Sequence, residues 1–160
     1  MVIKKWQHVA LLVGTVVVVE AIGGLSALLA GDIKQIYNQL VQPPLSPPDF
    51  VFGIVWPILY LLIGVAAYLL IVSQYHAAAK KTNLLLFALQ LFVNFIWSIV
   101  FFGGNLYWIG VPIILVLDAL VIACIVNFRR NQLWASYLMY PYLAWILFAT
   151  YLTIVVAILN

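Results

Sequence analysis

The chain has 160 residues, of which 68% are hydrophobic and only 7% are charged, and its mean hydropathy is +1.20. Soluble domains carry about a quarter charged residues, so this composition excludes an ordinary soluble domain and indicates an integral membrane protein. The net charge of +3 is too small for a nucleic-acid-binding surface but fits the flanks of membrane spans.

Five apolar stretches of about 20 residues predict five transmembrane helices. Alternating strand-length segments, which would indicate a barrel, are absent. We therefore expect an all-α membrane protein, with one five-helix transmembrane domain over residues 1–160. The predicted spans cover residues 8–30, 49–73, 82–102, 106–128 and 133–158.

Three predicted spans carry a polar side chain near their middle: Glu20, Asn94 and Asp118. Such residues are costly in a bilayer and are functional candidates by default. Each either hydrogen-bonds to a neighbouring helix inside the bundle or contacts a ligand directly, and the sequence leaves both interpretations open. Cys124 is the single cysteine, so neither a disulfide framework nor a cysteine-based metal site is expected.

The connection between the first and second spans is the longest, and it holds four prolines between residues 43 and 48. Proline lacks an N–H donor and restricts the residue before it, so no membrane helix runs through this stretch. We expect a short helix over residues 33–41, then an extended loop. The next helix begins near Pro48 or Asp49, and its spacing of four places three aromatic rings on one face: Phe52, Trp56 and Tyr60.

Tryptophan occurs at two depths in the predicted spans. Trp6, Trp108 and Trp134 lie near span ends, where they are expected to anchor the protein at the membrane interface. Trp97 and Trp145 lie deeper, Trp145 about 18 Å into the fifth span at 1.5 Å per residue. Deep tryptophans indicate either an aromatic cavity between helices or tight core packing.

The basic residues predict the orientation in the membrane. Five spans place the N-terminus with the second and fourth loops on one side, and six of the seven lysines and arginines lie there: Lys4, Lys5, Lys80, Lys81, Arg129 and Arg130. Lys34 alone lies on the other side. The positive-inside rule therefore predicts a cytoplasmic N-terminus, with the proline loop and the C-terminus outside.

Three ordered blocks carry a family resemblance. The proline loop and the helix after it read QPPLSPPDFVFGIVWPILY, residues 94–103 read NFIWSIVFFG, and residues 141–152 read PYLAWILFATYL. From about Tyr37 to Asn160 the chain resembles the TspO/MBR family of tryptophan-rich sensory and translocator proteins. The resemblance implies five transmembrane helices, commonly in a homodimer, and a pocket for porphyrins and haem-type tetrapyrroles. Animal members also bind cholesterol and benzodiazepine-type drugs, so drug-like small molecules are further expected ligands.

The resemblance also implies which residues form the site. A pair of pocket tryptophans that supports light-dependent protoporphyrin breakdown in some bacterial members matches Trp56 and Trp145. The other implied ligand-binding residues are Phe52, Tyr60, Asn94, Trp97, Asp118, Tyr142 and Ala149, and no metal ligand is expected. The chain departs from the family pattern at Ile36, Gln42 and Leu45, so we expect weaker loop contacts to an anionic tetrapyrrole. It also lacks a basic residue after Tyr151, so sterol binding is not supported.

Three functions remain open from the sequence. The first is a tetrapyrrole-binding membrane receptor or stress sensor. The second is an enzyme that degrades protoporphyrin in light and oxygen through Trp56 and Trp145. The third is a transporter of small apolar or anionic compounds, which the lack of a visible inverted repeat disfavours. A small-residue surface containing Gly103 and Gly104 is one candidate for the homodimer interface.

Overall fold

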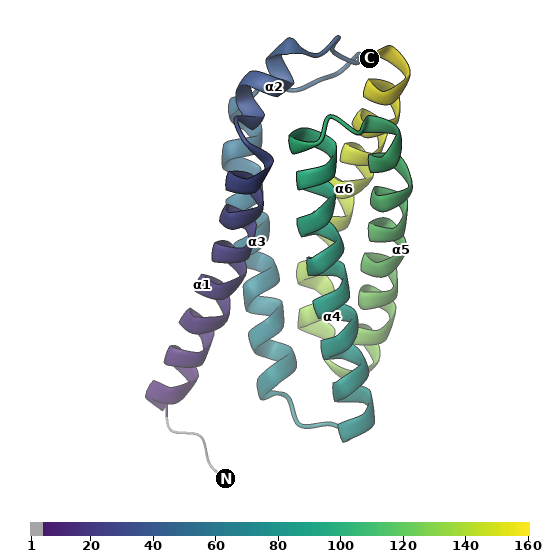
Figure 1. Cartoon of the computed structure of the whole chain (residues 1–160). Helices are drawn as coiled ribbons and strands as arrows, with labels where there is room; N and C mark the ends of the chain where they lie inside the picture. Colours follow the sequence, from purple (N-terminus) through teal and green to yellow (C-terminus); the bar gives the residue numbers. More distant parts are fainter. Residues whose placement is uncertain (1–4) are drawn as a thin grey trace.

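The structure is a computed structural model that describes residues 5–160, and over this range it contains helices and no strands (Figure 1). Five helices are long and apolar enough to cross a membrane, which confirms the predicted all-α, five-span fold. The helical elements are α1 (Lys5–Ala30), α2 (Ile33–Gln39), α3 (Phe50–Val72), α4 (Ala77–Ser98), the π-helical segment η1 (Ile99–Gly103), α5 (Tyr107–Asn131) and α6 (Leu133–Leu159).

The start of α4 differs from the sequence prediction. The helix begins at Ala77, five residues before the predicted span, because three alanines and two lysines favour helix despite their weak apolar signal. Lys80 then points back toward the end of α3, where its ammonium donates to the carbonyls of Ile71 and Ser73. A cation at a helix C-terminus satisfies carbonyls that lack intrahelical partners.

The π-helical segment η1 at the end of α4 was not predicted. Here the Gly104 N–H donates to the Ile99 carbonyl at 2.9 Å, five residues back. The wider turn lets two consecutive rings, Phe101 and Phe102, both be buried. π-turns of this kind are frequent at functional sites, and this one lies beside the cavity described below.

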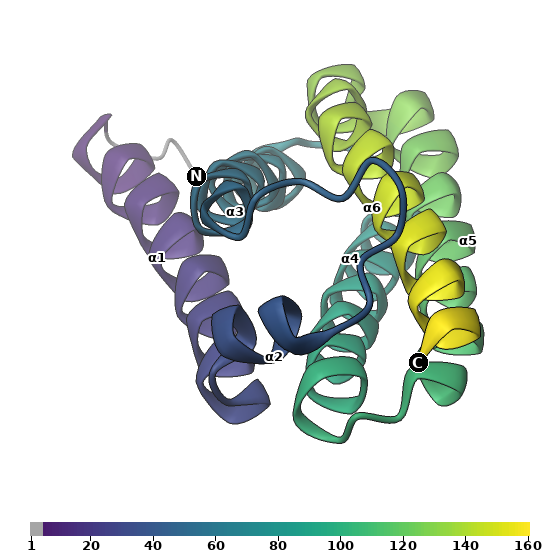
Figure 2. The same cartoon turned by 90° about the horizontal axis from the view of Figure 1, so that it is seen from above.

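Figure 2 shows how the helices are arranged around the bundle. α1 lies on one flank, α5 and α6 lie on the opposite flank, and α3 and α4 lie between them. α5 packs against α4 and α6, and α3 packs against α1 and α6. α2 and the proline loop cross one end of the bundle, where they cover the space between α1, α3 and α4.

Two glycines allow α1 to approach α3 closely. A Cβ on Gly64 would lie 2.7 Å from the Cα of Val16, and a Cβ on Gly23 would lie 2.2 Å from the ring of Tyr60. Both positions therefore need glycine for close helix packing. Gly103, a candidate for the dimer interface, also lies close to α1 of its own chain, where an added Cβ would lie 3.2 Å from the Cα of Ala30.

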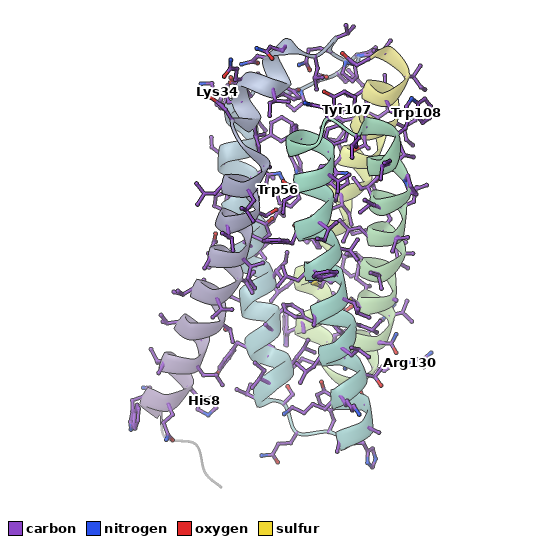
Figure 3. The ribbon with its side chains drawn as sticks, in the orientation of Figure 1. His8, Lys34, Trp56, Tyr107, Trp108 and Arg130 are labelled. Atoms are coloured by element: carbon purple, nitrogen blue, oxygen red, sulfur yellow. The ribbon has the colours of Figure 1, made fainter. Side chains whose placement is uncertain are left out.

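The outer surface fits a bilayer. Three tryptophans near helix ends are about two-thirds exposed, at 65% for Trp6, 66% for Trp108 and 68% for Trp134, as expected of interface anchors. Figure 3 places Lys34 at the same end of the bundle as Trp108, and Arg130 toward the other end. Lys4, which contributes to the predicted charge bias, lies outside the described residues, and the cytoplasmic N-terminus stays a prediction.

Candidate ligand-binding site

A cavity of about 430 Å³ lies between α1, α3 and α4, below α2. This volume is within the range of sites for small organic ligands, roughly 300–1,000 Å³. Five predicted site residues line it: Phe52, Trp56, Tyr60, Asn94 and Trp97. The first three lie four residues apart on α3 and follow one helix face, as the sequence spacing predicted. The last two lie three residues apart on α4 and also share one face.

Aromatic rings form much of the cavity wall. The rings of Trp56 and Tyr60 are stacked, with centroids 5.4 Å apart and planes 26° from parallel. At the covered end, the Tyr37 ring from α2 meets Phe52 edge-on at 4.9 Å. On the α4 side, the Trp97 ring stacks on Phe101 at 5.4 Å. The wall thus offers flat apolar faces, which suit a flat apolar ligand.

The same wall holds polar side chains, one of which has no hydrogen-bond partner within residues 5–160. The Tyr60 hydroxyl donates to Asn94 Oδ1 at 2.9 Å, which fixes the orientation of the amide. The other end of the Asn94 amide interacts with the Tyr142 hydroxyl, whereas the indole N–H of Trp97 has no hydrogen-bond partner in this range, although its side chain is buried. Buried donors without partners are costly. Both side chains line the cavity, but these N–H groups are themselves buried in its wall, so a ligand oxygen reaches the Trp97 N–H only if the side chain rotates.

The structure does not bring the two predicted α6 aromatics into the cavity. Tyr142 is fully buried in the core and contacts the outer side of the stack, with its ring 6.5 Å from Trp56. Trp145 lies at the depth expected from the sequence, but its ring packs against Phe52 at 5.8 Å and against Phe148. Both therefore contact lining residues, Trp56 and Phe52, without lining the cavity themselves.

Asp118 and Ala149 also lie outside the cavity. Asp118 on α5 accepts a hydrogen bond from the Thr150 hydroxyl of α6 at 2.8 Å, which corresponds to the interhelical role left open above. Ala149 lines a separate small hollow of about 20 Å³ that shares Phe52 and Trp97 with the main cavity. The predicted site thus divides into a cavity-lining group on α3 and α4 and a supporting group on α5 and α6.

A lid, defined as residues 33–49 of α2 and the proline loop, covers the outer end of the cavity. Within the lid the Tyr37 hydroxyl donates to the Pro47 carbonyl at 2.8 Å, and Asn38 Nδ2 donates to Asp49 Oδ2 at 2.8 Å. Lys34 Nζ lies 3.6 Å from the same carboxylate oxygen. The hydrogen bond from Asn38, with a further contribution from the Lys34 charge, lowers the pKa of Asp49. Burial raises the pKa of the Tyr37 hydroxyl, which keeps it a donor.

α6 also holds the lid, from the far side of the bundle. The Tyr151 hydroxyl donates to the Pro44 carbonyl at 2.7 Å. Asn160 pairs with the backbone of Val41, accepting from its N–H at 2.9 Å and donating to its carbonyl at 3.3 Å. Leu45, at the tip of the loop, has a φ of 66° and is 85% exposed. Several separate contacts therefore determine the position of the lid.

Sequence reasoning placed Glu20 among the candidates for ligand contact, but it did not predict the other residues that α1 and the lid contribute to the cavity. The lining residues from these two elements include Glu20, Gly23, Gly24, Ala27, Lys34, Tyr37 and Asp49, and of these only Glu20 was named as a candidate site residue. The first four lie at intervals of three and four residues, which places them on one face of α1. A carboxylate and small residues on one helix face could have predicted that α1 lines a cavity. The prediction was not made because α1 lacks the aromatic residues that indicated a binding face on α3.

Comparisons with known proteins agree with this architecture. The TspO/MBR family profile matches residues 13–159. The chain is 35% identical to the tryptophan-rich protein TspO of Archaeoglobus fulgidus over 157 residues, covering 96% of this chain and 99% of the relative. It is 33% identical to the tryptophan-rich sensory protein of Cereibacter sphaeroides (71% of this chain, 70% of the relative) and 33% identical to the human translocator protein (78% and 75%). On its sequence, its five-helix fold and these matches, the chain belongs to the TspO/MBR family.

Proposed function

We propose that this integral membrane protein is a receptor or stress sensor that binds a tetrapyrrole, of the porphyrin or haem type, in the cavity under the lid. One observation carries the proposal. The cavity combines the stacked rings of Trp56 and Tyr60 with two polar side chains, Asn94 and Trp97, and the indole N–H of Trp97 lacks a partner among the described residues. A tetrapyrrole is a flat, largely apolar disc with acceptor groups at its edge, and this combination matches it.

Each part of the site has a role in this proposal. The stacked pair of Trp56 and Tyr60 covers one face of the disc, since aromatic stacking adds about 0.5–1.5 kcal/mol beyond the burial of apolar area. The indole N–H of Trp97 donates to an edge oxygen, which removes the cost of leaving this donor unpaired. Among the described residues, Lys34 is the one basic residue that lines the cavity. It belongs to the lid, so it is the residue nearest to a ligand propionate at the outer end.

A titration of the purified protein with protoporphyrin in darkness tests the proposal. Trp56→Leu removes one of the two stacked rings and should weaken binding about tenfold, from lost stacking and apolar contact. Trp134→Leu, at an exposed position near the start of α6, is the matched control and should bind like the wild type. Equal affinity in the wild type and Trp56→Leu, with both folded by thermal melting, would contradict the proposed site.

A second candidate function is light-dependent degradation of the bound porphyrin. It is favoured by Trp56, an oxidisable indole that lines the cavity in contact with a second oxidisable ring, Tyr60. In the test, the complex of protein and porphyrin is illuminated in air, and the product is identified by its absorbance spectrum and its molecular mass. Trp56→Phe should slow product formation more than Trp145→Phe, because the Trp145 ring lies behind Phe52. Equal rates for the wild type and both variants would remove this candidate.

We also propose that the N-terminus is cytoplasmic and that the lid lies outside. The lid end of the bundle carries Lys34, whereas Lys80 and Arg130 belong to the other end. Single cysteines at Lys34 and Lys80, labelled from each side of the membrane, test this. Labelling of both positions from one side would contradict the five-span orientation.

A further inference from the structure

The inference concerns Glu20, a carboxylate that faces the cavity from deep within α1. Fifteen residues after Lys5, it lies about 22 Å along the helix, well inside a hydrocarbon layer roughly 30 Å thick. Gly23, Gly24 and Ala27 line the same cavity, and their spacing from Glu20 places all four residues on one helix face. Glu20 therefore belongs to the face of α1 that lines the cavity.

The described part of the protein supplies no partner for this carboxylate. Within residues 5–160, Glu20 makes no hydrogen bond or ion pair, and the cavity-lining cation, Lys34, lies instead beside Asp49 in the lid. The charged residues that line the cavity within residues 5–160 are therefore two carboxylates, Glu20 and Asp49, and one ammonium, Lys34. The lining thus has one negative charge in excess. An intramembrane carboxylate normally pairs with another group, so the cavity is electrostatically suited to a cation.

Two aromatic rings lie beside Glu20. Gly23, one turn further along α1, is in contact with the Tyr60 ring, and the Trp56 ring is stacked on Tyr60. Glu20 and this pair thus line the cavity at neighbouring positions of α1 and α3. A cation close to such rings gains about 0.5–2 kcal/mol from their quadrupoles, most where water is excluded. A carboxylate next to aromatic faces is the chemistry that recognises a substituted ammonium group.

We propose that the cavity binds amphiphilic ammonium compounds, with an aromatic or apolar body and one cationic nitrogen. The nitrogen lies between Glu20 and the Trp56–Tyr60 pair, and the apolar body extends toward Phe52 and Trp97. This ligand class does not depend on tetrapyrrole binding. It shares the Trp56–Tyr60 pair and Trp97 with the proposed tetrapyrrole contacts, but its recognition rests on Glu20 of α1, which those contacts do not include.

The test uses two probes of the same shape that differ in charge. The first is 4-phenylbenzyl-trimethylammonium, and the second is its neutral analogue with a carbon in place of the nitrogen. Dissociation constants are measured for the full chain in a neutral detergent and corrected for partitioning into micelles. The wild type should prefer the cation about tenfold, as expected for an ion pair with cation–π contact. Equal corrected affinities in the wild type would overturn the proposal without any variant.

A variant assigns the preference to Glu20. Glu20→Gln keeps the size of the side chain and removes its charge, so it should bind the neutral probe within twofold of the wild type and lose the preference for the cation. Asp32→Asn is the charge-matched control, because Asp32 caps α2 outside the cavity lining and asparagine also caps helices well. It should keep the full preference. An unchanged preference in Glu20→Gln, or an equal loss in Asp32→Asn, would overturn the assignment.

Discussion

Gly23→Ala tests the packing that builds the cavity wall. The added Cβ would lie 2.2 Å from Tyr60 Cε2 and 2.5 Å from Cδ2, so either α1 or the Tyr60 ring must move. The ring is held on two sides, by its hydrogen bond to Asn94 and by its stacking on Trp56. Overpacking of this kind costs about 1–3 kcal/mol. We therefore expect Gly23→Ala to destabilise the protein and to move α1 away from α3.

The adjacent glycine provides the control. Gly24 lines the same cavity, but a Cβ there has no atom of the described residues within 4 Å. Both substitutions gain the same helix propensity, about 0.8–1.0 kcal/mol, so the difference between the two variants reports the overpacking alone. Thermal melting in one detergent at one scan rate should give Gly23→Ala an apparent Tm several degrees below that of Gly24→Ala. Equal Tm values would show that α1 is free to shift and would refute the close-packing argument.

Three further predictions concern the scaffold and the lid. Thr150→Val removes the donor to Asp118 and leaves a buried carboxyl without partners, so stability should fall by about 1–3 kcal/mol in a thermal melt; an unchanged Tm would mean that water replaces the hydroxyl. Asn160→Ala should speed hydrogen exchange of the Val41 amide while exchange in α5 stays constant. Protection of Val41 equal to that of the wild type would show that Asn160 does not hold the lid. The pKa of Asp49 is lowered from 3.8, so its contribution to lid closure is present at neutral pH and is lost as pH falls through the lowered value. The dissociation rate of an uncharged probe should therefore be flat from pH 7 to 5 and rise below 3.8; a rise near neutral pH would refute this sign.

The sequence was sufficient to predict the fold and one side of the cavity. Long apolar stretches specify spans, and a spacing of four residues specifies one face of a helix, so the rings of α3 could be placed without coordinates. The depth of Trp145 was also predictable, since it depends only on the rise per residue. The direction in which the Trp145 side chain points was not predictable, because the rotation of α6 about its axis depends on packing against α3 and α5. The π-segment η1 and the early start of α4 depend on local hydrogen bonds that hydropathy does not report.

The polar residues illustrate the same limit. Glu20, Asn94 and Asp118 looked equivalent in sequence, each half way along a span. In the structure Asp118 joins α5 to α6, Asn94 accepts a hydrogen bond from Tyr60 of α3, and Glu20 lies in the cavity wall with no hydrogen-bond partner in the described range. Their roles differ because each neighbour comes from another helix, and the identity of that neighbour is a property of the assembled bundle.

The lining of the cavity has a consequence for protein engineering. Every described residue that lines it lies between Glu20 and Phe102, whereas α5 and α6 contribute packing and the two contacts that hold the lid. Ligand preference is thus encoded in one contiguous segment. A chimera that joins residues 20–102 of this chain to the last two helices of a relative should inherit the ligand preference of this chain, and the reciprocal chimera that of the relative.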